Sequence, residues 1–189
     1  MQDDTFIPVL ERDLVFFDTE TTGLELDKEI IEIGYVKARA GTFEVIEEGD
    51  IKIKPEHIEA ASPEALEING YDAEEWAREG VSAKEGVQKF LSVTKNALLV
   101  GHNLPFDWAH LLVLLQQLGT EPNFFYKGFD TFPMAWLLLR GDPKFVKFSL
   151  EELSAHFGID QGRAHRAIDD ARTTYRVFKK LTEMRKEQI

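Results

Sequence analysis

Two acidic residues, Asp18 and Glu20, interrupt an apolar run near the start of the chain, at 15–24 (VFFDTETTGL). If this run is a strand, its side chains alternate with period two, so both carboxylates lie on one face. Two neighbouring carboxylates repel each other unless a cation or a proton lies between them. Hard divalent cations prefer such oxygen ligands. The pair therefore indicates a metal site, and a strand end where acids simply meet solvent explains it about equally well.

Asp107 is a third candidate ligand, at the end of the segment 99–107 (LVGHNLPFD). This segment runs from a predicted strand into a predicted helix. A carboxylate in the first turn of a helix is stabilised by the backbone dipole by about 0.3–1 kcal/mol. Taken alone, that role explains Asp107 better than metal binding does. In an α/β sheet, however, ligands bind beyond the carboxyl ends of the strands, so the position also suits a metal-site acid.

In the last predicted helix, 167–183, two adjacent acids lie on different faces. At about 100° per residue, Asp170 lies about 60° from the centre of the apolar face and Asp169 about 160° from it. We therefore expect Asp169 to point at water and Asp170 to flank the buried face, with Arg166 as a partial ion-pair partner. His165 precedes this helix and titrates near neutral pH, so it could accept a proton from a metal-bound water. A lone histidine is more often an ordinary surface or capping residue.

The elements that position these residues follow from the pattern of apolar and turn-forming residues. Strands are predicted at 14–18, 30–37, 43–53 and 97–100. Helices are predicted at 82–94, 105–118, 133–139, from Ser149, and at 167–183, with an irregular and partly helical stretch at 56–79, a turn at 128–131 and an exposed loop at 140–147. Short connections make the first three strands antiparallel. Later alternation of strand and helix predicts an α/β fold with a mixed sheet covered by helices.

The composition is that of a globular protein forming one domain, residues 1–189, with 43% hydrophobic and 30% charged residues. No apolar run approaches the roughly 18 residues that span a bilayer, so we expect no membrane contact. The acidic N-terminus is unlike a secretory signal, and the absence of cysteine excludes disulfides and thiolate metal sites. We expect a cytoplasmic protein. Its net charge of −12 argues against a broad nucleic-acid-binding surface and leaves room for a small local site.

Three segments together resemble the motifs of the DEDDh, or DnaQ-like, family of 3′–5′ exonucleases, which includes bacterial proofreading subunits, ribonuclease T and oligoribonuclease. They are VFFDTETTGL at 15–24, GHNLPFD at 101–107 and HRAIDDA at 165–171. Weaker matches extend the resemblance over roughly 11–181: IIEIGYV, FDT, LEELSAHFGI and TTYRVFKKL. The resemblance implies a ribonuclease-H-like fold, which agrees with the mixed sheet expected from the pattern.

The same resemblance implies a role for each candidate residue. Four acids would bind two divalent cations, Mg²⁺ or Mn²⁺, and they are Asp18, Glu20, Asp107 and Asp170. His165 would be the general base that deprotonates the attacking water. The two ions, about 3.5–4 Å apart, would bracket the scissile phosphate. The 3′-terminal nucleotide would then leave as a 5′-monophosphate.

Residues beside these acids are expected to contact substrate. Thr21, Gly23 and Leu24 follow the first motif acids directly. Gly23 allows a close backbone approach, and in similar proteins the leucine equivalent to Leu24 wedges against the terminal base. Phe106 is a further candidate for base stacking, although core packing explains it somewhat better. Basic residues near the motifs could contact phosphates or simply form a solvated charged face: Arg163, Arg166, Arg172, Lys144 and Lys147. No functional residue is expected in the acidic stretch at 56–79.

The motifs look more like those of DNA-directed members, so the expected substrate is a single-stranded or frayed 3′ end of DNA. An RNA-directed exoribonuclease of the ribonuclease T or oligoribonuclease kind is the alternative. The chain has no polymerase-sized extension, so proofreading would require a separate DNA polymerase as partner, and stand-alone trimming is equally compatible. A non-catalytic module that binds polynucleotide ends or a polymerase is disfavoured because all five motif residues are present.

Overall fold

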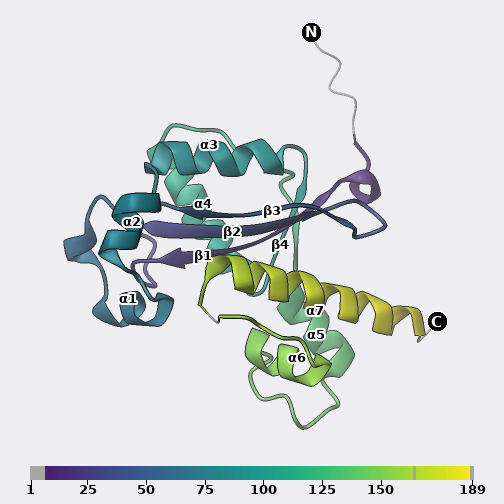
Figure 1. Ribbon diagram of the computed structural model, residues 1–189. Helices are drawn as coiled ribbons and strands as arrows, with labels where there is room; N and C mark the ends of the chain where they lie inside the picture. The colour runs from purple at the N-terminus through teal and green to yellow at the C-terminus, as the bar shows by residue number, and fades with distance from the viewer. Residues whose placement is uncertain (1–6, 164, 188–189) are drawn as a thin grey trace.

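The computed structural model describes residues 7–163 and 165–187 and contains a five-stranded sheet in the order β3-β2-β1-β4-β5 (Figure 1). The strands are β1 Leu14–Thr21, β2 Ile30–Ala38, β3 Val45–Lys52, β4 Leu98–Gly101 and β5 Gly128–Asp130. The first three strands pair antiparallel, whereas β4 pairs parallel to β1 and β5 parallel to β4. The predicted mixed sheet is therefore confirmed.

Seven α-helices and two short 3-10 helices surround this sheet in the described residues. They are η1 Val9–Glu11, η2 Ile58–Ala60, α1 Pro63–Asn69, α2 Ala73–Glu79, α3 Ala83–Thr94, α4 Leu104–Gln117, α5 Thr131–Leu139, α6 Leu150–Phe157 and α7 Ala167–Glu187. Helices α3 and α4 cover one face, and α7 covers the other with α5 and α6 beyond it (Figure 1). None of the helices described here is long and apolar enough to cross a membrane.

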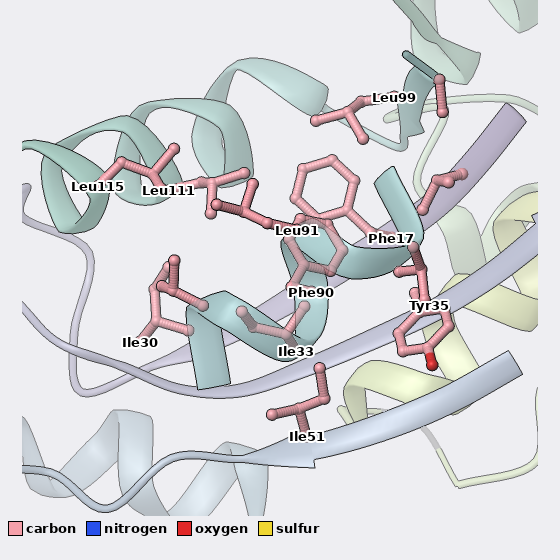
Figure 2. Packing of buried hydrophobic residues seen from close by; sticks show 14 of the residues in the cluster. Phe17, Ile30, Ile33, Tyr35, Ile51, Phe90, Leu91, Leu99, Leu111 and Leu115 are labelled. Carbon is pink, nitrogen blue, oxygen red and sulfur yellow. The ribbon is translucent and has the colours of Figure 1, made fainter. Parts of the chain in front are cut away.

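Alternation along β1 decides which side chains face which layer. Phe17 packs with Phe90 of α3, and the core that contains both also includes Leu111 of α4 (Figure 2). Phe16 points the other way and packs against Phe178 of α7. Because side chains two residues apart share a face, the even-numbered positions of β1 all look toward α7. The acids at positions 18 and 20 therefore face the helix that carries the third motif.

The sequence interpretation of 128–131 as a turn is wrong. Gly128–Asp130 form strand β5 at the sheet edge, and α5 begins at Thr131. Only three residues pair with β4, which is too short to produce a periodic pattern, and glycine and aspartate are typical turn residues. The first strand also continues to Thr21, so its two acids lie within the strand and not at its end.

Candidate metal centre

Asp107 is anchored to β1 between the two acids of that strand. Its Oδ1 accepts hydrogen bonds from Thr19 N at 2.9 Å and from Thr19 Oγ1 at 2.7 Å. The side chain is 3% exposed and stands in the first turn of α4. Burial raises the pKa of the Asp107 carboxyl to about 7, although the two bonds from Thr19 oppose this. These bonds do not use Oδ2, which remains as a candidate ligand atom beside β1.

Asp170 and His165 come from the entrance of α7, which Figure 1 shows next to the end of β1. The Asp170 carboxyl is buried, and its Oδ2 accepts a hydrogen bond from His165 N at 3.0 Å. His165 itself has a left-handed backbone with φ of 60° and an exposed side chain. Ligand atoms of Glu20, His165 and Asp170 all lie within 4.8 Å of one another. The first and third motifs therefore meet in space.

The four acids strongly affect one another. Burial raises the pKa of Asp18 well above its usual value, and repulsion from Asp107, Asp170 and Glu20 raises it further. Burial likewise raises the pKa of Glu20 to about 8, with Asp170 as the largest repelling charge, and raises that of Asp170 to about 6. Such a group of carboxylates is stable only when it holds protons or cations. The donor set fits hard divalent ions, which prefer carboxylate oxygen.

We expect the metal-free protein to lose thermal stability as the pH rises from about 4.5 to about 8. In the unfolded chain Glu20 ionises near 4.5, but when folded it keeps its proton to about 8, so the folded state binds more protons across this window. Stability then falls as pH rises. Calorimetry in chelator should show the melting temperature dropping by roughly 5–15 °C.

Excess Mg²⁺ or Mn²⁺ should restore most of that loss at pH 8, because ions that bind only the folded state stabilise it by mass action. The same addition at pH 5 serves as the control, since protonated carboxylates bind metal weakly and little change is expected. A melting temperature that is independent of pH without metal would contradict the repulsion described above.

Two expectations about neighbouring charges are corrected. Arg166 does not pair with Asp170. Its guanidinium contacts Glu32 at 2.8 Å and approaches Asp50 and Glu75 at 3.6 Å. Asp169 does face away from the other acids, but its carboxylate does not simply point at water. It pairs with Arg172 at 3.1 Å and accepts a hydrogen bond from Arg163 N.

Glu32 is a residue that the sequence interpretation missed. It is fully buried, lies opposite Glu20 in the β1–β2 register, and accepts hydrogen bonds from Arg166 Nε and Nη2 and from Ala167 N. Gly34 lies two residues further on the same strand, and a Cβ there would overlap the backbone of Ala167. Glu32 and Gly34 thus fix the start of α7 on β2. The available signal was an acid inside the apolar run IIEIG.

The predicted substrate residues form the continuation of β1. Thr21 and Gly23 are buried, and Thr21 Oγ1 donates to Gly23 O at 2.6 Å. Leu24 is 79% exposed, so its side chain is accessible to a ligand. Phe106 is half-buried, and its ring centroid lies 4.4 Å from that of His110. The contacts of these residues with substrate stay predictions.

The acidic stretch at 56–79 takes part in this region, although no functional residue was expected there. Asn69 is buried at the end of α1, and its Nδ2 donates to Thr21 O at 3.1 Å. Ser62 N also donates to Thr22 O at 2.8 Å. The stretch therefore supports the backbone that follows the strand acids.

Two of the five basic residues proposed to meet phosphates are already engaged. Arg166 pairs with Glu32 and its neighbours, as described above, and Arg172 pairs with Glu48 at 2.6 Å and with Asp169. The remaining basic side chains are exposed and available to a ligand: Arg163, Lys144 and Lys147.

Comparisons with known proteins agree with this geometry. The model of the exonuclease family RNase_T matches residues 15–178. The DNA polymerase III PolC-type protein of Thermotoga petrophila is 35% identical over 175 residues, which are 92% of this chain and 12% of that protein. The DNA polymerase III subunit epsilon of Treponema pallidum is 33% identical over 166 residues, which are 86% of this chain and 73% of that subunit. This chain thus spans about an eighth of the PolC-type relative and most of the epsilon relative.

Solved structures show the same fold. Exonuclease I of E. coli in complex with a dT13 oligonucleotide superimposes with a TM-score of 0.80 at 20% identity, over 94% of this chain and 42% of that one. A second structure of exonuclease I gives a TM-score of 0.78 at 21% identity, over 91% of this chain and 41% of that one. The mixed sheet with its antiparallel start and parallel end is therefore of the ribonuclease-H-like kind.

Proposed function

Because the chain belongs to the RNase_T family of DnaQ-like 3′–5′ exonucleases, we propose that it removes nucleoside 5′-monophosphates one at a time from the 3′ end of DNA. The observation that carries this proposal is the meeting of three distant motifs near the carboxyl end of β1, the central strand of the sheet. Ligand atoms of Glu20, His165 and Asp170 lie within 4.8 Å of one another, and the charges of Glu20, Asp107 and Asp170 repel that of Asp18.

Members of this family use divalent metal ions. In this chain, two such ions, Mg²⁺ or Mn²⁺, would be held by the four clustered acids: Asp18, Glu20, Asp107 and Asp170. When bound, the ions stabilise charge on the attacking and leaving oxygens of a phosphodiester. Thr19 contributes by fixing the rotamer of Asp107, so that α4 presents its carboxylate without further ordering on binding.

His165 would accept the proton of the attacking water. Its side chain is exposed at the entrance of the site, where an incoming water and scissile phosphate can reach it. Its backbone N–H is bonded to Asp170, so the base and one ligand acid keep a fixed relation. Glu32 and Arg166 hold the adjoining start of α7. Proton transfer by such a positioned base accelerates a reaction by typically 10²–10⁴-fold.

The 3′-terminal nucleotide would lie between the first motif and α4. Leu24 would pack against the terminal base and Phe106 would stack on it, both without regard to base identity. Gly23, which has no side chain, and the neighbouring Thr21 would let main-chain groups approach the nucleotide closely. Because the protein is strongly acidic, with a net charge of −12, contacts with phosphates should stay local and few.

DNA is the favoured substrate because the curated relatives named above are DNA polymerase III components and a structural neighbour holds a dT13 oligonucleotide. A DNA polymerase is accordingly a candidate partner. RNA is the alternative substrate, and recognition of a 2′-hydroxyl would decide between them. A purely end-binding module is the non-catalytic alternative.

The decisive experiment is digestion of matched single-stranded DNA and RNA oligonucleotides that carry a 5′ label. With Mg²⁺ or Mn²⁺ we expect stepwise shortening of the DNA from its 3′ end, with nucleoside 5′-monophosphates as products. Chelator should abolish the reaction, and RNA should be shortened at least about tenfold more slowly if the 2′-hydroxyl is rejected.

A parallel reaction with 3′-labelled DNA gives the control for direction, because the label should then be released at once as a mononucleotide. Oligonucleotides that stay intact under every metal condition would favour the binding module. Faster loss of RNA than of DNA would replace the substrate assignment while keeping the reaction.

A further inference from the structure

The segment 24–27, called here the Leu24 loop, is closed at its base by two hydrogen bonds between Thr22 and Glu29. Thr22 N donates to Glu29 O at 2.9 Å, and Glu29 N donates to Thr22 Oγ1 at 2.9 Å. Beyond these two bonds the loop is exposed to solvent, with Leu24 79% exposed and Leu26 52% exposed. The Thr22–Glu29 bonds alone therefore do not fix the direction in which the Leu24 side chain points.

One side chain of another element reaches the Leu24 loop by a hydrogen bond among the described residues. His110 Nε2 lies 3.1 Å from Glu25 O, a pair that is 85 positions apart in sequence. The Glu25 carbonyl also accepts from Lys28 N at 3.0 Å, but that bond stays within the connection itself. His110 is thus the connection between the loop and helix α4.

His110 also touches the other side of the proposed nucleotide site. It lies one turn after Asp107 in α4 and is 2% exposed. Its Nδ1 is 3.0 Å from Phe106 O, and its ring centroid lies 4.4 Å from the Phe106 ring at an interplanar angle of 46°. A single buried imidazole therefore contacts both the Leu24 loop and Phe106.

The chemistry of the ring decides which contact carries a proton. Both partners are carbonyl oxygens, which accept only, whereas a neutral imidazole has one N–H. The Phe106 carbonyl stands four residues before His110, so it is the acceptor of the helical ladder. The Glu25 carbonyl lies outside any helix. With its proton on Nε2, the ring donates a hydrogen bond to the Glu25 carbonyl and so joins α4 to the Leu24 loop. A buried imidazole requires at least one hydrogen-bond partner.

We propose that His110 is a positioning residue that holds the Leu24 loop on α4 and so sets the gap between Leu24 and Phe106. The ligand of this gap is the unpaired base of a 3′-terminal nucleotide, which would lie between an aliphatic side chain and an aromatic ring. The proposal rests on the function proposed above and adds a residue to the four motif acids and the general base. It concerns binding of the terminal nucleotide, not the hydrolytic step.

The test compares His110→Phe with His110→Gln. Phenylalanine keeps a ring against Phe106 but lacks a donor for Glu25, whereas the glutamine amide can place an N–H where Nε2 stood. For single-stranded DNA with Mn²⁺, we expect His110→Phe to raise KM by roughly three- to tenfold, as for loss of a buried hydrogen bond, with kcat within about twofold. His110→Gln should recover most of the affinity. Calorimetric Mn²⁺ affinity should be unchanged in both.

A fluorescent base gives a readout that a general loss of stability would not produce. With Ca²⁺ in place of the catalytic ion, wild-type protein should quench 2-aminopurine at the 3′ terminus by stacking, and His110→Phe should quench it less. The same probe placed four nucleotides inside the strand should respond alike in both proteins. The matched control is His156→Phe, a like substitution at an exposed histidine of α6, which should behave as wild type.

A measurement on the wild-type protein keeps the proposal testable if His110→Phe does not fold. Nitrogen-15 spectra of the imidazole should show His110 protonated on Nε2, with a slowly exchanging hydrogen. A ring protonated on Nδ1 alone would overturn the proposal, as would wild-type KM and quenching in His110→Phe. Absence of both quenching and cleavage in the wild-type protein would instead contradict the proposed function itself.

Discussion

Replacing Asp170 with asparagine is expected to reduce the rate of DNA cleavage by more than about a thousandfold, as for loss of a residue that acts within a catalytic unit. The same substitution at the adjacent Asp169 should leave the rate within about threefold. The two side chains differ in where α7 points them. Asp170 is buried near Glu20, whereas Asp169 pairs with Arg172.

The effects of Asp170→Asn and Asp169→Asn on stability should not follow their effects on activity. Burial raises the pKa of Asp170 to about 6, so at pH 8 without metal its charge destabilises the fold, and asparagine removes that charge. The amide oxygen can still accept from His165 N. Asp169→Asn loses a partly exposed ion pair worth about 0–1 kcal/mol. We therefore expect the inactive variant to melt no lower than wild type, and the active one slightly lower.

The measurement combines initial rates on a 5′-labelled oligonucleotide, calorimetric Mn²⁺ binding and melting temperature for both variants. Asp170→Asn should lose rate and Mn²⁺ affinity together. Equal losses of activity in the two variants would contradict the placement of these acids on different faces of α7. Full activity in Asp170→Asn would remove it from the metal centre.

The face of α7 was predictable because helical periodicity is a local property. All of the residues expected on its apolar side are buried: Ala167, Ala171, Thr174, Phe178 and Leu181. The antiparallel start of the sheet was predictable for the same reason, since short connections leave few alternatives. Strand β5 was not, because three residues at a sheet edge take their conformation from pairing with β4 and not from their own sequence.

Ion pairing was the least predictable feature of the site. Arg166 stands four residues before Asp170, so helical geometry made them plausible partners. In the structure the guanidinium instead meets Glu32, which is 134 positions away in sequence. Local spacing offers a candidate pair, but the choice among candidates depends on which carboxylate is buried deepest and most needs compensation. Glu32 is fully buried, and its carboxylate is the one that pairs with Arg166.

Contacts between the acidic stretch and the first motif were hidden for a similar reason. Asn69 donates to the backbone carbonyl of Thr21. Every residue has such a carbonyl, so the sequence does not indicate which one a side chain binds. His110 and Glu25 form the same kind of contact. Asp18 could be assigned from the sequence because its charge conflicts with the apolar residues before it. Asn69 and His110, which bind backbone carbonyls, gave no such conflict.

Replacing His165 with alanine is expected to lower kcat by about 10²–10⁴-fold, the usual contribution of a general base, while Mn²⁺ affinity stays close to that of wild type. The reason for this separation is that His165 is bonded to Asp170 through its backbone N–H and not through its ring. Loss of the imidazole therefore leaves the carboxylate of Asp170 in place. A ring that served as a metal ligand would instead lower the Mn²⁺ affinity when removed.

The left-handed backbone of His165, with φ of 60°, requires a matched variant. Alanine tolerates this conformation poorly, whereas asparagine adopts it readily and also lacks a general base. If the loss in His165→Ala comes from missing chemistry, His165→Asn should be equally slow, and free imidazole in the buffer should restore part of the rate in the alanine variant. If it comes from backbone strain, His165→Asn should recover activity. Near-normal turnover in either variant would remove His165 from the role of base and leave the four acids to activate the water unaided.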